Sequence, residues 1–202
     1  MIMKVIGLCG GSGSGKGAVS SLFGTYGIPA IDTDAVYHDI TSHPSDCLDA
    51  LSREFGPRVV KDGGLDRAAL REIVFFSPDS EGKLERLNAI THKYIIAETE
   101  KIISAYEKRS VPGVIIDAPL LFESGLDKRC DTVIAVVANR EVRLARIMLR
   151  DGITLESARA RIDAQLSDVR LAEMADLVIR NDGTLDELKS AVRAAYEQIF
   201  EN

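Results

Sequence analysis

The chain has 202 residues, of which 46% are hydrophobic and 28% charged, a globular composition that excludes collagen-like and disordered classes. Its 25 Lys and Arg against 31 Asp and Glu give a net charge of −6, so we expect no nucleic-acid partner. The three cysteines are widely spaced and predict neither a disulfide framework nor a zinc site, and without a signal or membrane-spanning segment we expect a cytoplasmic protein away from membranes.

Short apolar runs alternate with longer helical patterns along the chain. The runs predict strands at 4–9, 28–32, 113–117, 132–137 and 177–179. Helical periodicity predicts helices at 16–26, 65–76, 83–108, 140–150, 155–166 and 185–200. Such alternation implies right-handed crossovers, so the predicted fold class is α/β, with a three-layer α/β/α core around a parallel five-stranded sheet.

Two segments do not fit this alternation. Residues 35–110 are too long for one crossover, so we interpret them as a helical insertion that binds a substrate. Residues 151–168 are rich in arginine and are interpreted as a lid. The nucleotide-binding core is then built from 1–34, 111–150 and 169–202.

The strongest motif lies between the first predicted strand and the first predicted helix. It matches G-x-x-x-x-G-K, the phosphate-binding loop, in the structural context that this motif requires. Glycines let the backbone turn its N–H groups toward one anion, and the helix N-terminus adds a favourable dipole. The predicted nucleotide-binding residues are Gly11, Ser12, Gly13, Ser14, Gly15, Lys16 and Gly17.

The loop departs from the usual motif at one position. Gly17 stands where a serine or threonine hydroxyl normally ligates Mg²⁺ beside the phosphates. A water molecule, Ser14 or Ser20 would have to take over that contact. Nucleotide binding is expected to survive, because the backbone makes the cradle.

Acidic residues follow two of the predicted strands. Asp32 and Asp34 come after the second strand, where one acid can accept a proton and the other can order Mg²⁺. The alternative is that an aspartate merely caps the next helix. Asp117 ends another apolar strand and is a second candidate for contact with Mg²⁺, as an outer-shell group.

Arginines gather before and inside the predicted lid. A closing lid can deliver them to the charge that develops on a transferring phosphoryl group. The alternative is a solvated helix face. The arginines are Arg140, Arg143, Arg146, Arg150, Arg159 and Arg161.

Taken together, these segments resemble the dephospho-CoA kinases, P-loop kinases related to the nucleoside monophosphate kinases. The resemblance covers nearly the whole chain and rests on the order and spacing of short motifs. They are GLCGGSGSGK at 7–16, IDTD at 31–34, LNAITH at 87–92, PLLFE at 119–123, RD at 150–151 and RIDAQ at 161–165. In two places the chain departs from the family pattern, at Gly17 and at Lys93, where proline usually follows the histidine.

The resemblance implies transfer of the γ-phosphate of ATP, with Mg²⁺, to the ribose 3′-hydroxyl of dephospho-CoA, which gives coenzyme A. It implies that Asp34 is the general base and that Lys16 and Arg150 stabilise the transferring group. It places Asn181 near the adenine of ATP, and assigns acceptor binding to Asp34, His92, Pro119, Leu120, Leu121, Phe122 and Arg161.

Four alternatives stay open from the residues alone. Another small-molecule P-loop kinase, acting on a nucleoside or nucleotide, shares most of these motifs. A nucleotide-dependent switch without catalysis is a further alternative, which Gly17 favours. His92 could be a plain helix-surface histidine, and Leu120, Leu121 and Phe122 could simply pack in the core.

Overall fold

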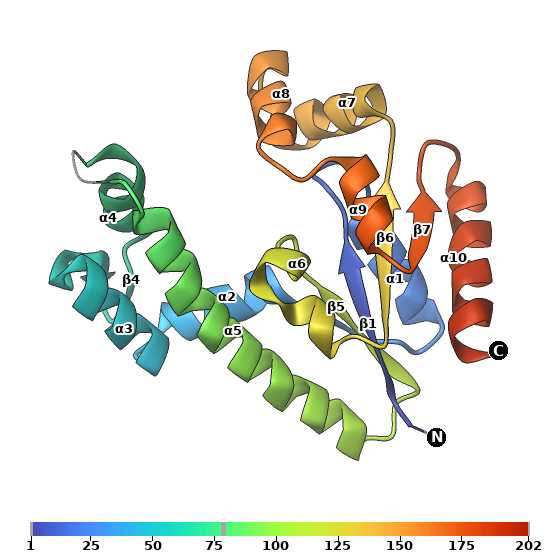
Figure 1. Cartoon of the computed structure of the whole chain (residues 1–202), viewed down its shortest axis with the longest axis horizontal. Helices are drawn as coiled ribbons and strands as arrows, with labels where there is room; N and C mark the ends of the chain where they lie inside the picture. Colours follow the sequence, from blue (N-terminus) through green and yellow to red (C-terminus); the bar gives the residue numbers. More distant parts are fainter. Residues whose placement is uncertain (1, 78–79, 202) are drawn as a thin grey trace. The chain divides into compact units, whose positions relative to one another are not determined.

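The computed structural model describes residues 2–77 and 80–201 and divides into two compact units (Figure 1). The first unit comprises Met1–Ile31 and Arg109–Asn202, and the second comprises Asp32–Lys108. The predicted lid segment belongs to the first unit. Within the described parts of the chain, every helix is too short or too polar to cross a bilayer.

A five-stranded sheet forms the centre of the first unit, in the order β2-β5-β1-β6-β7. The pairings of β1 with β5, β1 with β6, and β6 with β7 are parallel, which confirms the predicted α/β class. The second and last predicted strands differ slightly from the observed ones in length. The strands are β1 (Lys4–Cys9), β2 (Ala30–Asp32), β5 (Gly113–Asp117), β6 (Thr132–Val137) and β7 (Leu177–Arg180).

Helices cover both faces of this sheet. On one face, Val19 and Phe23 of α1 share a buried cluster with Ile6 of β1 and Val192 of α10. On the other face, Gly7 has no side chain, and a Cβ there would lie 2.8 Å from the Leu121 side chain of α6. The helices are α1 (Lys16–Thr25), α6 (Leu121–Ser124), α7 (Arg140–Asp151), α8 (Leu155–Asp163), α9 (Asp168–Met174) and α10 (Leu185–Phe200), with a 3₁₀ turn at Leu126–Arg129.

The second unit is mostly helical and has its own core. Leu51, Val59 and Leu70 are buried there, and the long helix α5 contributes partly buried side chains such as Ile95. Its elements are α2 (Thr33–Ser42), α3 (Asp46–Phe55), a 3₁₀ turn (Pro57–Val59), β3 (Val60–Lys61), β4 (Gly64–Leu65), α4 (Arg67–Arg71), a π-helical segment (Glu72–Phe76) and α5 (Lys83–Lys108).

The single helix predicted at 65–76 is wrong. Leu65 instead pairs with Val60 in a short antiparallel hairpin. The helix starts two residues later because the Asp66 side chain accepts a hydrogen bond from the Ala69 N–H at 2.9 Å, which fixes Asp66 as its N-cap. After Arg71 the backbone widens into a π-helical turn. A capping aspartate inside an otherwise helical pattern was the signal for this boundary.

Candidate active site

The loop between β1 and α1 has the backbone of an anion cradle. Gly13 and Gly15 adopt positive φ values of 79° and 97°, which favour glycine. A Cβ on Gly15 would lie 2.1 Å from the Asn181 amide nitrogen, so the close approach also demands glycine there. Gly15 is the N-cap of α1 and caps it with no side-chain hydrogen bond. The N–H groups of the first turn therefore suit an anionic ligand.

Lys16 begins α1 and lies beside the acid that ends β5. Its Nζ is 3.2 Å from Asp117 Oδ1, and both side chains are 18% exposed. The two charges are therefore partly shielded from water, which strengthens their attraction. The carboxylate therefore keeps the ammonium of Lys16 beside the loop, and contact of this cation with phosphate oxygens stays a prediction.

Ser14, a predicted substitute for the missing hydroxyl at Gly17, has no solvent-exposed surface. Its Oγ has no hydrogen-bond partner among residues 2–77 and 80–201. A buried unpaired hydroxyl is costly unless a water or ligand completes it. This orphan oxygen is consistent with a loop that is finished by a bound phosphate.

Asn181 follows β7 and holds the loop directly. Its Nδ2 donates to the Ser14 carbonyl at 2.8 Å, and its own N–H donates to the Val137 carbonyl at 2.8 Å. The residue is 7% exposed. Contact with the adenine of ATP stays a prediction, whereas the contact with the loop backbone is a role that the sequence did not suggest.

Two arginines of α7 point at the same loop rather than into solvent. Arg143 Nε donates to the Ser12 carbonyl at 2.9 Å. Arg146 Nη1 lies 3.3 Å from the Gly13 carbonyl and 3.4 Å from the Ser14 carbonyl. These two residues contact the backbone of the loop between β1 and α1, which distinguishes them from the other arginines near the predicted lid.

Arg150, the predicted catalytic arginine, forms a two-point contact with the next residue. Its Nε and Nη2 lie 2.7 and 2.9 Å from the two carboxylate oxygens of Asp151, which also pairs with Arg161 of α8. The hydrogen bond from Arg150, with help from Arg161, lowers the pKa of the Asp151 carboxyl to about 2. Asp151 is therefore ionised at neutral pH and holds both arginines at the α7–α8 junction.

The predicted acceptor segment at 119–122 is split between surface and core. Pro119 and Leu120 line a small cavity of about 90 Å³ together with Gly10, Gly11 and Gln165. Leu120 is 44% exposed, whereas Leu121 is fully buried. Phe122 is half-buried. The Leu121 side chain packs over Gly7 in the core, and its contact with an acceptor stays a prediction.

The remaining predicted residues belong to the second unit. Asp32 is the N-cap of α2, where its Oδ1 accepts from the N–H groups of Asp34 and Ala35 at 2.9 and 3.2 Å. This is the capping role that was weighed for the pair, and it leaves Asp34 on the first turn of α2 with an exposed side chain. His92 lies on α5 and is half-buried.

The donor set for Mg²⁺ is sparse. Among the described residues, no three His, Cys, Asp or Glu side chains converge as a ready-made metal site. Mg²⁺ in phosphate-transfer sites usually takes one or two carboxylates and completes its shell with phosphate oxygens and water. Asp117, which lies 3.2 Å from Lys16 of the loop, fits that pattern.

Sequence comparison identifies the family. A model of the family described as dephospho-CoA kinase matches residues 4–187. The chain belongs to the dephospho-CoA kinase family.

Curated relatives of this family match over nearly the full length. The dephospho-CoA kinase of Symbiobacterium thermophilum is 40% identical over 195 residues, covering 96% of this chain and 80% of the relative. The dephospho-CoA kinase of Fusobacterium nucleatum is 38% identical over 200 residues, covering 98% of this chain and 100% of the relative. The resemblance drawn from the short motifs is therefore confirmed.

Solved structures agree with the family assignment. The crystal structure of TT1252 from Thermus thermophilus has a TM-score of 0.79 at 31% identity and covers 98% of this chain and 99% of its own. The dephospho-CoA kinase from Campylobacter jejuni has a TM-score of 0.70 at 26% identity and covers 98% of this chain and 97% of its own. A shikimate kinase from Acinetobacter baumannii, at 14% identity and a TM-score of 0.53, shows the P-loop kinase fold alone.

Proposed function

We propose that this chain transfers the γ-phosphoryl group of ATP to the ribose 3′-hydroxyl of dephospho-CoA, the last step in coenzyme A formation. The contact that carries the proposal is the 3.2 Å pair between Lys16 and Asp117 at the phosphate-binding loop. Membership of the dephospho-CoA kinase family is the reason for proposing dephospho-CoA as the acceptor. The loop backbone, which is suited to binding phosphate, supports ATP as the phosphoryl donor.

In the proposed reaction, the carboxylate of Asp34 accepts the proton of the 3′-hydroxyl. The oxygen attacks the γ-phosphorus, and the bond from that phosphorus to the β–γ bridging oxygen breaks, so that ADP leaves with the electron pair. Lys16 stabilises the charge that develops on the phosphoryl oxygens. Arg150 and Arg161 add to this stabilisation when they release the Asp151 carboxylate and contact the phosphoryl oxygens instead. Asp34 suits the base role because its side chain is exposed, whereas Oδ1 of Asp32 accepts the hydrogen bonds that cap α2.

Mg²⁺ would be held on the protein side by Asp117, with Asp32 as a water-mediated candidate. When bound, the ion neutralises charge on the β- and γ-phosphates. Lys16 performs the same task from the chain itself. Gly17 has no side-chain hydroxyl, so carboxylates and water would take the place of the hydroxyl that the usual P-loop motif supplies.

The acceptor panel that tests the proposal contains dephospho-CoA, AMP, CMP, uridine and shikimate. ADP release is followed with each acceptor at saturating ATP. We expect turnover with dephospho-CoA and little with the others. Turnover of a competitor with dephospho-CoA inert would mean another small-molecule kinase, and ATP binding without turnover of any acceptor would favour the nucleotide switch.

A further inference from the structure

Ser12, at the turn of the phosphate-binding loop, is held on three sides by residues far along the chain. Its N–H donates to Gln165 Oε1 at 2.9 Å, and its Oγ accepts from Gln165 Nε2 at 3.2 Å. Its carbonyl accepts from Arg143 Nε at 2.9 Å. The N–H, the carbonyl and the hydroxyl of Ser12 are therefore all hydrogen-bonded. Their partners are Arg143 of α7 and Gln165, which follows α8.

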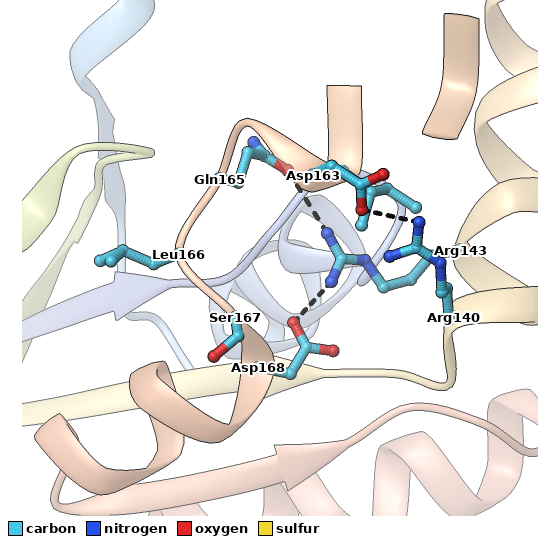
Figure 2. Close-up of a pocket in the computed structure, with 8 residues that line it drawn as sticks. Arg140, Arg143, Asp163, Gln165, Leu166, Ser167 and Asp168 are labelled. Atoms are coloured by element: carbon cyan, nitrogen blue, oxygen red, sulfur yellow. Dashed lines mark hydrogen bonds and ion pairs between the residues drawn. The ribbon is translucent and has the colours of Figure 1, made fainter. Parts of the chain in front are cut away.

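Arg143 is itself held firmly. Its Nη1 lies 2.6 Å from Asp168 Oδ1, its Nη2 donates to Gln165 Oε1 at 3.3 Å, and the residue is 3% exposed. Figure 2 shows the guanidinium between Gln165 and Asp168, beside a cavity of about 280 Å³. A buried charge that is paired and hydrogen-bonded in this way keeps one orientation. Gln165 Oε1 consequently accepts from two donors at once.

The loop is shaped around this arginine. A Cβ on Gly11 would lie 2.1 Å from Arg143 Nη2, so the guanidinium packs directly on the glycine that precedes Ser12. Gly13, which follows Ser12, has a positive φ of 79°. A segment with glycine on both sides of one serine loses much conformational entropy when it is ordered. Contacts that fix the serine in advance reduce that loss when a ligand binds.

We propose that Gln165 and Arg143 are positioning residues for the phosphate-binding loop, and that Gln165 couples the end of the lid segment to it. The inference rests on the proposed function only in taking ATP as the nucleotide. Gln165 follows α8 directly, and the Gln165 N–H donates to the Ile162 carbonyl at 3.1 Å. A displacement of the lid helix therefore reaches Ser12 through a single side chain.

A purely structural role is the competing explanation, in which these contacts only hold α7 and α9 together. Arg143 cannot separate the two roles, since its removal would leave Asp168 without its buried partner and endanger folding. Gln165 can, because it is uncharged and half-buried. Gln165→Leu removes all of its contacts with Ser12 at similar size. Gln165→Glu keeps an acceptor for the Ser12 N–H and for Arg143 but cannot donate to Ser12 Oγ.

The experiment measures the Kd for ATP without acceptor, the KM for each substrate, and the melting temperature. The matched control is Gln198→Leu, the same substitution at an exposed position on α10. We expect Gln165→Leu to raise the Kd and KM for ATP by roughly tenfold. Gln165→Glu should raise the Kd for ATP by about threefold, and the control should match the wild type.

Two results would overturn the inference: a wild-type Kd for ATP in Gln165→Leu, or a fall in melting temperature and active fraction with an unchanged KM for ATP. Because the Kd for ATP is measured without acceptor, the test does not depend on which acceptor the enzyme uses. A wild-type chain that binds ATP but leaves dephospho-CoA unphosphorylated would refute the proposed function alone.

Discussion

Lys16 Nζ and Asp117 Oδ1 lie 3.2 Å apart, which joins the first residue of α1 to the last residue of β5 at the carboxyl end of the sheet. In open parallel sheets, ligands bind beyond this end of the strands. The pair therefore lies at the end of the sheet where a ligand of this fold is expected.

Removing the Lys16 charge should impair both nucleotide binding and the chemical step. We expect Lys16→Met to lower kcat/KM for ATP by about 10²-fold or more, because a positioned charge-stabilising group is lost. The matched control is Lys189→Met on α10, where the ammonium pairs with the exposed Asp186 at 2.8 Å. Steady-state kinetics on both variants provide the measurement. Similar kinetics for the two would remove Lys16 from the mechanism.

The centre of the sheet could be predicted from sequence because β1, β5 and β6 are short apolar runs in which successive residues are buried. The bounds of β1, β5 and β6 match the prediction. The helix predicted at 65–76 failed because periodicity outweighed the capping signal of Asp66. Hydrophobic patterns report burial and period, and they carry little information about where a polar side chain ends an element.

The side chains that hold the loop were harder to predict. The sequence predicts the same role for Arg143 as for the other arginines around the lid, although its side chain is almost fully buried against the loop. Gln165 belonged to a family motif without any role. The contacts of both residues with Ser12 span more than 100 residues along the chain. Local spacing carries no signal for such pairings.

Asp34 is expected to act as a base without serving ATP affinity. Asp34→Asn should lower kcat by ~10² or more, the usual contribution of a general base, while the Kd for ATP stays near the wild-type value. Asp39→Asn, at an exposed position on the same helix, is the control. Single-turnover assays and equilibrium ATP binding separate the two effects. Asp34 would lose its assigned role if turnover in the asparagine variant stayed normal.

Gly17 offers room for the hydroxyl that the loop lacks. A Cβ built at this position meets no heavy atom within 4 Å, so Gly17→Ser and Gly17→Ala should both fold. Both should raise the free energy of unfolding, the serine variant by about 0.5 kcal/mol, because glycine is a poor helix former. The serine variant alone should lower the Mg²⁺ concentration needed for half-maximal activity.

Melting curves and Mg²⁺ titrations of these two variants give independent readouts. The alanine variant controls for helix propensity, since it adds the Cβ without the oxygen. An identical Mg²⁺ requirement in both variants would show that the hydroxyl has no ligating role in this loop.

The cysteines should be unreactive in the folded chain. Burial raises the pKa of the Cys9 thiol to about 12, that of Cys130 to about 12 and that of Cys47 to about 11. At pH 8, a pKa near 11 leaves about one thiol in a thousand as the reactive thiolate. Native protein should therefore react slowly with a disulfide reagent, whereas unfolding in guanidinium should release three thiols rapidly. Fast labelling of the folded chain would contradict the prediction that burial keeps the three thiols protonated and unreactive.

The position of the transferred phosphate tests the central claim most directly. The wild-type chain is incubated with ATP, Mg²⁺ and dephospho-CoA, and the product is examined by phosphorus NMR and compared with authentic coenzyme A. The account predicts a new phosphomonoester on the ribose 3′-oxygen, formed in equal amount with ADP. A phosphate on any other oxygen, or ADP formed without a phosphorylated acceptor, would contradict it.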